Sequence, residues 1–579
     1  MRQSITRLLD YPITRFAGLA ALLAVACSVT PRDSITLSVV GTNDLHGRVV
    51  SEQGRGGLAL LDGYLRNLRA ARAHDGGAVL LIDAGDLFQG TLESNLNEGA
   101  VVISAYNALH YDAAAIGNHE FDYGPAGPAT APQSTEDDPV GALKARIAQA
   151  TFPFVAANIF DKGTSRPIAW HNVQPSVILT VGGIRVGVVG LTTLETLGAT
   201  LSANTRGFDV VPLAPALERE ARRLRADGAT VIVATAHAGG RCTEFVNPAD
   251  LSSCAPNAEI FDVARALPAG LVDVIVAGHR HEGIAHEVNG VAVISSYTGG
   301  RAFGRIDLTI DRATGRATNH HIFPPHNVCE RDDPATGQCG LPGQGTPAQY
   351  EGAAIAASPE IAAILAPAVE VAQAAKGKSL NTMIEGTVPR GEGETAAGDL
   401  LADWTRAAAG SVDAAIINSG GVRTAVPAGP LTYGRLYELT PFDNRDARLT
   451  LTGAELATIV RENLSRRGDM ILLSGIRATA TCGVGGLHVS LRRESGKPIA
   501  DRELLSVVTS DFLATDGSDI FAPVMPFRAV ATLDGPILRD EIAEWLTRTS
   551  GSWRASEFAE PAHRRLVYEG TRPVRCGGR

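Results

Sequence analysis

Side chains that can bind metal ions recur at five places in the sequence, each directly after a short apolar run. They are Asp44 and His46; Asp86; Asn118, His119 and Asp122; His237; and His279 and His281. Imidazole nitrogens and carboxylate or amide oxygens are ligands suited to Zn²⁺ or Mn²⁺ rather than to metals that prefer thiolates. About seven such ligands suit two ions about 3.5–4 Å apart that share one carboxylate. Such a pair stabilises the attacking and leaving oxygens of an in-line displacement at phosphorus.

The apolar runs before these side chains are predicted to be buried strands, since they are rich in β-branched or small apolar residues. They are SITLSVV (34–40), AVLLIDA (78–84), DAAAI (112–116), TVIVATA (230–236) and VDVIVAG (272–278). In open α/β sheets, sites form at the carboxyl ends of the strands, so the five clusters can converge in one crevice. For any one cluster, a polar surface loop or a structural histidine is the alternative. Their recurrence at five strand ends favours a shared site.

Strands alternate with helical stretches from residue 34 to about 323, which indicates an α/β layered domain. The remaining predicted strands are SVILTV (176–181) and IRVGVVGL (184–191), and the amphipathic helices are GLALLDGYLRNLRAARA (57–73) and PALEREARRLRADG (215–228). Residues 125–140 form a Pro- and Thr-rich loop, and residues 324–348, rich in Pro, Gly and Asp, are interpreted as a boundary. From about residue 379 a second α/β pattern begins, with AAIINSGG (414–421) and LLSVVTS (504–510) as strands.

A helix is predicted to connect the two α/β regions. Ser358 is a plausible N-cap, Pro359 occupies the first helical position, and Gly377 stands where a C-terminal cap belongs. Pro367 is expected to kink this helix, because proline removes a backbone donor.

Composition sets broad limits on function. The chain has 579 residues, of which 45% are apolar and 20% charged, so it is an ordinary soluble globular protein in composition, long enough for two or more domains. The net charge of −10 argues against binding of nucleic-acid polymers, which calls for a basic face. Beyond the N-terminus no run of about 18 consecutive apolar residues occurs, so no other membrane span is predicted.

The N-terminus has the pattern of a signal peptide. Arginines precede the apolar stretch FAGLAALLAVA (16–26), which is too short to span a bilayer as a mature helix. The stretch ends at LAVAC (23–27), which resembles a bacterial lipobox with Cys27 as the lipidated residue. We therefore predict an exported lipoprotein whose membrane anchor faces the periplasm or the cell surface. A soluble periplasmic or secreted protein is the alternative.

Six cysteines remain after Cys27, an even number, as expected of disulfides in an oxidising compartment. Two pairs each bracket one polar loop, and the last pair follows by elimination. The predicted disulfides are Cys242–Cys254, Cys329–Cys339 and Cys482–Cys576. None of the cysteines has the spacing of a zinc-finger site.

The series D-x-H, G-D, G-N-H-E, H, G-H-x-H resembles the calcineurin-like metallophosphoesterase superfamily. Within it, GTNDLHG, GNHEFDYG, GGVR and PFDN look like the 5′-nucleotidase / UDP-sugar hydrolase family, and the resemblance covers nearly the whole mature chain. It implies an N-terminal αββα sandwich that binds two metals and a C-terminal α/β domain that binds substrate. The expected divisions are a signal peptide with lipobox (1–27), a metallophosphoesterase domain (34–325), a linker helix (350–378) and a nucleotide-binding domain (379–570).

The resemblance also implies the ligand sets. One ion would be held by Asp44, His46, Asp86 and His281, and the other by Asp86, Asn118, His237 and His279. The ions are expected to be Zn or Mn, with Co or Mg as alternatives. At the position of His281 the family also has Gln or Asn.

His119 and Asp122 resemble the family's catalytic pair, with the imidazole near the phosphate and the carboxylate orienting it and favouring its charged form. Glu120 is expected to be structural. Asp83 is not expected to bind metal, because Asp86 is the acid of the Gly-Asp motif.

The C-terminal region carries the predicted substrate contacts. Arg423 follows a Gly-rich turn in INSGGVR (417–423), which suits capture of a phosphate or carboxylate. The resemblance implies contacts from Phe442 and Asn444 of TPFDN, and Phe512 offers a second aromatic ring. Two such rings could sandwich a purine or a pyrimidine with tolerance of base identity. Packing in the core is the alternative for each Phe.

Two departures from the family pattern lie in this region. FLATDGSDIF is one residue longer than the family's F-L-A-x-G-G-D-G-F, with Ser518 and Ile520 in place of glycines. Asp519 is the counterpart of the family's acidic ribose contact. Only Arg390 precedes GETAAG, where the family has a further Arg. These departures predict a substrate preference different from that of typical members.

The sequence thus predicts an exported dimetal phosphohydrolase that removes phosphate from nucleotides, with UDP-sugars or 2′,3′-cyclic nucleotides as further substrates. One alternative is a related dimetal hydrolase with a non-nucleotide substrate, such as a sulfur-oxidation thiohydrolase. Another is a nucleotide-binding surface lipoprotein without turnover. The sequence predicts no oligomeric state.

Overall fold

The computed structural model describes residues 33–576 except for residues 334, 337, 392, 516, 526–534 and 559–562. The predicted signal peptide and lipobox, residues 1–27, lie outside the described residues. Among the helices that are described, none is both long enough and apolar enough to cross a bilayer.

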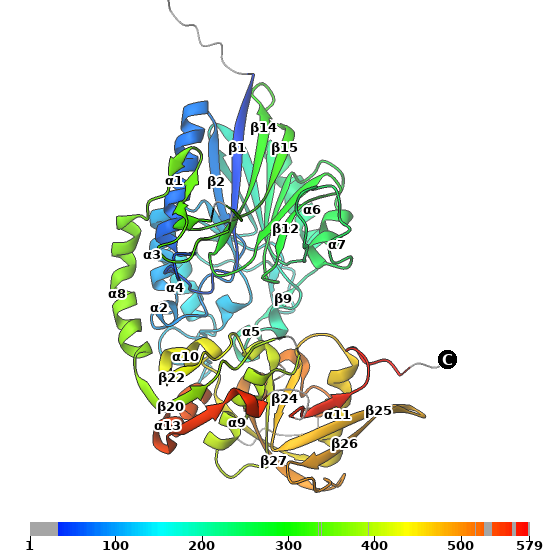
Figure 1. Cartoon of the computed structure of the whole chain (residues 1–579). Coiled ribbons are helices and arrows are strands. Elements are labelled where there is room, and N and C mark those ends of the chain that lie inside the picture. Colours follow the sequence, from blue (N-terminus) through cyan, green and yellow to red (C-terminus); the bar gives the residue numbers. More distant parts are fainter. Residues whose placement is uncertain are drawn as a thin grey trace, which may run out of the picture. The chain divides into compact units, whose positions relative to one another are not determined.

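Two β-sheets form the N-terminal half (Figure 1). The first has seven strands in the order β15 (Ala317–Asn327), β14 (Ala302–Asp311), β1 (Ser34–Thr42), β2 (Ala78–Asp83), β3 (Ala113–Ala115), β4 (Phe154–Val155) and β6 (Val173–Gln174). The second has six, in the order β12 (Gly283–Val288), β13 (Val291–Ser296), β11 (Val274–Ala277), β10 (Val231–His237), β8 (Ile184–Thr192) and β7 (Ser176–Val181). The neighbours β1–β2–β3 and β8–β10–β11 are parallel, so their carboxyl ends share an edge.

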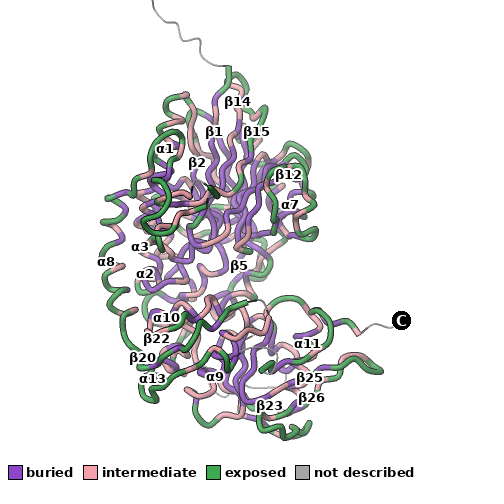
Figure 2. Tube along the Cα trace, viewed as in Figure 1, coloured by how far each residue is buried: buried purple, intermediate pink, exposed green. Residues whose placement is uncertain are grey.

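The alternation of side chains along these strands explains the layering. In β10, Val231 and Val233 pack in the core between the two sheets, whereas Ile232 and Ala234 face the helices outside. The first sheet is covered by α1 (Leu58–Asp75), α3 (Ala100–Leu109) and α4 (Gly141–Gln149), and the second by α6 (Leu213–Ala226) and α7 (Glu259–Ala266). Figure 2 shows the strands between these helices as buried. The predicted αββα sandwich is confirmed.

A single helix, α8 (Pro359–Lys376), connects the two halves and packs against α1, α2 (Leu92–Asn95), α3 and α10 (Tyr433–Leu439) (Figure 1). The Ser358 hydroxyl caps it by accepting a hydrogen bond from the Ile361 backbone N–H. Pro367 lies inside the helix without dividing it. The residues before it, which were included in the predicted linker helix, instead form the short strand pair β18 (Gln349–Tyr350) and β19 (Ala353–Ala354).

The C-terminal half is a second α/β unit with its own cores. Its central sheet has the order β23 (Asp446–Thr452), β27 (Leu504–Ser510), β21 (Ala414–Asn418) and β24 (Ile471–Ser474). Two further sheets run β22 (Gly429–Thr432), β20 (Ser379–Glu385), β28 (Gly551–Arg554) and β26 (Gly486–Arg493), β25 (Ile476–Gly483), β29 (Leu566–Tyr568). Its main helices are α9 (Ala396–Ala408), α10, α11 (Gly453–Ser465) and α13 (Leu538–Thr549), with the single turn α12 (Asp511–Ala514).

The six cysteines form the three predicted disulfides, Cys242–Cys254, Cys329–Cys339 and Cys482–Cys576. The first two close the polar loops that their spacing indicated. The third joins two cysteines that are 94 positions apart in the sequence and links the C-terminal segment to β25.

Candidate functional site

The five predicted clusters meet at the carboxyl ends of β1, β2, β3, β10 and β11. The first three strands belong to one sheet and the last two to the other, so the site lies at the shared edge of the sandwich. The ligand atoms fall into two groups, and the atoms of each group lie within 4.8 Å of one another. The groups are Asp44, His46 and His281, and Asp86, His237 and His279.

Asp86 lies between the two groups. Its Oδ2 is 3.1 Å from Nε2 of His237 in its own group and 3.8 Å from Nε2 of His46 in the other. Asn118 places its Oδ1 3.1 Å from the same Nε2 of His237. This is the arrangement that a carboxylate shared by two ions requires.

The histidines are oriented as metal ligands are. In His46 and His237 the Nδ1 atom lies 2.9 Å from a backbone carbonyl, that of Gln89 and of Ala84 respectively, which favours Nδ1 as donor and turns Nε2 toward the other ligands. His279 instead places Nε2 3.1 Å from Oε2 of Glu195 and turns Nδ1 toward Nε2 of His237, at 3.3 Å. The donor set and its orientation therefore fit two divalent ions.

Electrostatics in the cluster favour bound positive charge. Burial raises the pKa of Asp44, but His281 outweighs burial and brings this pKa down to about 2. Burial likewise raises the pKa of Asp86, and His237 and His119 lower it well below the usual range. Burial lowers the pKa of His237, whereas the Asp86 carboxylate raises it, to about 10. Both carboxylates are thus anionic and surrounded by groups that stabilise them in that form.

The backbone at the strand ends is strained. Five of the seven predicted ligands have a positive φ between 50° and 74°, a conformation that residues other than glycine rarely adopt: Asp44, His46, Asp86, His279 and His281. Gly117 shows a related constraint, since a Cβ at this position would lie 2.2 Å from Oδ1 of Asp86. Strain of this kind persists where function needs a fixed geometry.

His119 and Asp122 form a hydrogen-bonded pair beside the two groups. Nδ1 of His119 lies 2.6 Å from Oδ2 of Asp122, and the hydroxyl of Thr200 donates to the other carboxylate oxygen at 2.7 Å. Burial lowers the pKa of His119, but the carboxylates of Asp122 and Asp86 raise it above its ordinary value. The pair therefore favours an imidazolium whose Nε2 is left for other contacts.

The two other acids of these motifs have different surroundings. Glu120 accepts hydrogen bonds from the backbone N–H groups of Asp86 and Gly117 with Oε2, and from that of Leu87 with Oε1. It therefore ties the two metal-binding turns together. Asp83 is the buried last residue of β2, and its carboxylate accepts hydrogen bonds from the hydroxyls of Thr42 and Tyr106. Burial raises its pKa to about 7, which suits a structural acid.

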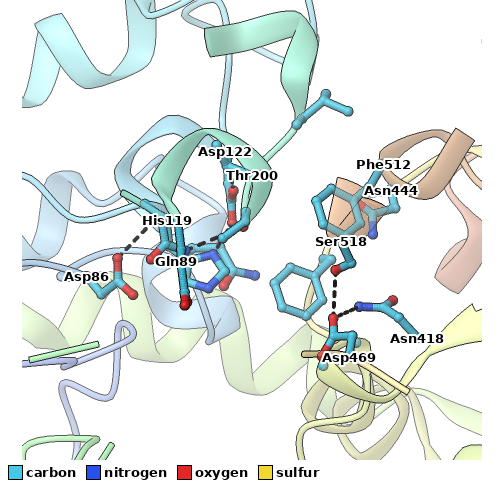
Figure 3. A pocket seen from close by; sticks show the side chains of 18 of the residues that line it. Asp86, Gln89, His119, Asp122, Thr200, Asn418, Asn444, Asp469, Phe512 and Ser518 are labelled. Atoms are coloured by element: carbon cyan, nitrogen blue, oxygen red, sulfur yellow. Dashed lines mark hydrogen bonds and ion pairs between the residues drawn. The ribbon is translucent and has the colours of Figure 1, made fainter. Parts of the chain in front are cut away.

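A cavity of about 1180 Å³ joins this cluster to the C-terminal half. The predicted metal ligands that line it are Asp86, Asn118, His279 and His281, followed by the pair His119 and Asp122, and the predicted substrate contacts are Arg423, Phe442, Asn444, Phe512 and Asp519. Figure 3 shows Asp86, Gln89 and His119 on one side of the pocket and Phe512, Asn444 and Asp469 on the other. The residues for metal binding and for substrate binding therefore face one space.

Phe442 and Arg423 lie near the His119 ring on the C-terminal side of the cavity. The ring centre of Phe442 is 5.7 Å from that of His119, and the guanidinium carbon of Arg423 is 5.7 Å from the centre of the Phe442 ring. The loop that carries Phe442 is held by the Pro441 carbonyl, which accepts hydrogen bonds from the side-chain amides of Gln89 and Asn95. The positive charge of Arg423 partly offsets the rise in the pKa of His119, so the two side chains act on the same site.

The remaining predicted contacts differ in position. Asp519 has a mostly exposed side chain, 3.8 Å from Arg466. Asn444 lines the cavity, whereas Arg390 is exposed, does not line it and donates to the carbonyl of Val422.

Several residues of the site were not among the predicted site residues. Gln89, Glu195, Thr200, Asn418, Asp469 and Ser518 line the cavity. Asn418 lies within the motif INSGGVR, as the last residue of β21, and could have been found there. The others come from loops whose positions depend on the tertiary fold.

Comparisons with known proteins agree with this arrangement. Residues 37–283 match the sequence model of the calcineurin-like phosphoesterases, and residues 371–525 match that of the 5′-nucleotidase C-terminal domain. Protein UshA of Yersinia enterocolitica is 26% identical over 534 residues, covering 86% of this chain and 90% of UshA. Endonuclease YhcR of Bacillus subtilis is 26% identical over 511 residues, and the chain spans 38% of that longer protein. The crystal structure of a 5′-nucleotidase precursor from Thermus thermophilus has a TM-score of 0.70 and 23% identity, covering 93% of this chain and 100% of that one.

Proposed function

Because the chain belongs to the 5′-nucleotidase family of the calcineurin-like metallophosphoesterases, and is thus a metal-dependent phosphoester hydrolase, we propose that it removes phosphate from nucleotides. The observation that carries the proposal is the cavity, in which the metal-ligand cluster faces Arg423, Phe442 and Phe512. A phosphate at the cluster would leave its nucleoside near the two aromatic rings.

The dimetal centre is expected to be held by the two ligand sets that share Asp86. They are Asp44, His46, Asp86 and His281, and Asp86, Asn118, His237 and His279. When bound, the ions supply Lewis acidity to the phosphate oxygens. Zn or Mn suits the nitrogen and oxygen donors, with Co or Mg as alternatives.

The chain's own side chains have distinct proposed roles. His119, kept protonated by Asp122, donates a hydrogen bond to the phosphate and offsets charge that develops on it. Arg423 contacts the phosphate from the C-terminal side, and Phe442 and Phe512 stack against the base. Asn444 and Asp519 are the proposed polar contacts to the nucleoside, and Arg390 a more distant one.

A screen for phosphate release tests the proposal. It compares AMP with UDP-glucose, 2′,3′-cyclic nucleotides and simple phosphomonoesters, and each reaction is repeated after chelation of metals. Single-stranded DNA belongs in the screen, because one relative is an endonuclease. Release from AMP supports the nucleotidase, whereas activity on phosphomonoesters alone reduces the function to that of a general metallophosphoesterase. Nucleotide binding without turnover would indicate a binding lipoprotein.

Replacing Phe442 with alanine is expected to raise KM for nucleotides by about 5- to 150-fold, since one base–aromatic stack contributes about 1–3 kcal/mol. The same change should hardly affect p-nitrophenyl phosphate, which needs only the metal cluster. Steady-state kinetics with both substrates measures the difference. Phe512→Ala provides the companion variant for the second ring. Equal loss of both activities would show that Phe442 is a packing residue.

We also propose that the protein is exported and anchored through Cys27, on the basis of the N-terminal sequence pattern. Cys27→Ala should move the protein from the membrane fraction to the soluble fraction without changing its specific activity. Fractionation followed by an activity assay measures both. A wild-type protein already soluble in the periplasm or the medium would contradict the anchor.

A further inference from the structure

Asp469 is a carboxylate of the cavity that the sequence motifs did not indicate. Asp469 lies between α11 and β24, and its Oδ2 accepts hydrogen bonds from Nδ2 of Asn418 at 2.6 Å and from Oγ of Ser518 at 2.7 Å (Figure 3). Within the described residues, no donor contacts Oδ1, and the carboxylate forms no ion pair. One oxygen is therefore occupied, and the other is available to a ligand in the cavity.

The position of this carboxylate is fixed from several sides. The backbone carbonyl of Asp469 accepts hydrogen bonds from Asn463 and Arg572. A Cβ on Gly420 would lie 2.7 Å from both carboxylate oxygens, so the loop after β21 approaches the carboxylate as closely as a glycine allows. Asp469 thus presents a preorganised acceptor rather than a mobile surface charge.

The loop that departs from the family pattern supplies part of this support. Ser518, which stands where the family has a glycine, adopts a positive φ of 54° and uses its hydroxyl to bind Asp469. Arg466 fastens the same turn by donating to the carbonyl of Ser518. The loop that carries Ser518 and the Asp469 carboxylate therefore line one polar side of the cavity.

Hydrogen bonding at this polar side of the cavity complements stacking on the aromatic rings. Stacking against Phe442 and Phe512 tolerates any base, because every base has a π-face. An ionised carboxylate only accepts hydrogen bonds, so it favours an amino group and disfavours a carbonyl oxygen at the same place. A site built to pair a donor discriminates strongly against an analogue that lacks it.

We propose that Asp469, held by Asn418 and Ser518, is a specificity-determining residue that selects nucleotides whose base carries an exocyclic amino group. This inference rests on the proposed nucleotidase function and names its substrate class. Oδ1 accepts a hydrogen bond from the amino group of adenine or cytosine. The oxo bases hypoxanthine and uracil place a carbonyl oxygen at the same ring position, against the carboxylate.

Two matched substrate pairs test the proposal, AMP with IMP and CMP with UMP, because within each pair an oxo group replaces the amino group and the adjacent ring nitrogen gains a hydrogen, while the rest of the nucleotide is unchanged. The wild type should show kcat/KM about 10- to 100-fold higher for the amino member, as expected for a hydrogen bond to a charged group. In Asp469→Asn the amide oxygen stays with the two donors and the amide nitrogen faces the cavity. This variant should lose or reverse the preference.

A control variant tests the base preference separately from the proposed nucleotidase function. Ser518→Ala removes one support of the carboxylate but leaves the acceptor, so it should retain the direction of the preference. A preference in either pair that Asp469→Asn abolishes or reverses supports the proposal.

Two outcomes overturn it while leaving the nucleotidase intact. They are equal kcat/KM within both pairs, and an equal loss for all four nucleotides in Asp469→Asn, which would assign Asp469 to the ribose or to loop structure. Failure to hydrolyse any of the four, with p-nitrophenyl phosphate still cleaved, would refute the proposed function and this inference together.

Discussion

Asp86→Ala is expected to abolish hydrolysis of every substrate. Asp86 is the carboxylate between the two groups of ligand atoms, 3.1 Å from His237 and 3.8 Å from His46, so its loss removes one ligand from each proposed ion. Metal ions contribute several kcal/mol of transition-state stabilisation, which corresponds to a decrease in kcat of at least about 10³-fold. Elemental analysis of the purified variant should show reduced metal content.

Asp83→Asn is the matched control for this experiment, because Asp83 is a buried acid of the same motif that contacts hydroxyl groups instead of the cluster. The control should keep its metal and its activity. In the wild type, chelation should remove activity, and Mn, Co or Zn should restore it. Full activity of a metal-free preparation would contradict the dimetal assignment.

His119→Ala is expected to lower kcat by about 10²–10⁴-fold while both ions stay bound, the usual range for a positioned acid–base or electrostatic group. Its Nδ1 is occupied by Asp122, and its backbone N–H, which alanine retains, donates to Oδ1 of Asp86. The side chain is thus directed at the substrate space rather than at a ligand position.

The readout that separates the two roles of His119 is metal content measured alongside kcat. Retained metal with slow turnover supports an electrostatic role, and lost metal would reassign His119 to the ligands. Thr200→Val offers a graded companion, because it removes only the hydrogen bond that orients Asp122. We expect a smaller decrease in kcat from this variant than from His119→Ala.

The α/β layering and the gathering of the polar clusters at strand ends could be predicted from local rules, whereas the αββα sandwich and the two ligand sets were implied by the family resemblance. Continuous apolar runs such as β10 predict strands buried on both faces, and parallel neighbours bring their carboxyl ends to one edge. The motifs predicted that Glu120 and Asp83 are not metal ligands, and the hydrogen bonds of both side chains agree with this prediction.

The rest of the cavity depends on contacts that no local pattern encodes. Thr200 reaches Asp122 across 78 residues, and Asp469 meets Asn418 across 51. Hydroxyl and carboxylate groups in loops are common, so nothing in their spacing marks these as partners. Arg390 shows the opposite case, in which a motif was present but the side chain lies outside the cavity lining.

The left-handed backbone at the metal cluster links metal supply to the survival of the protein. A residue other than glycine held in that region costs about 1–3 kcal/mol, so the five together oppose folding by about 5–15 kcal/mol, comparable with the whole stability of a domain. Ligands that bind only the folded state restore stability in proportion to the logarithm of their concentration. Removal of divalent ions should therefore lower the thermal stability of the chain and its resistance to proteases as well as its activity.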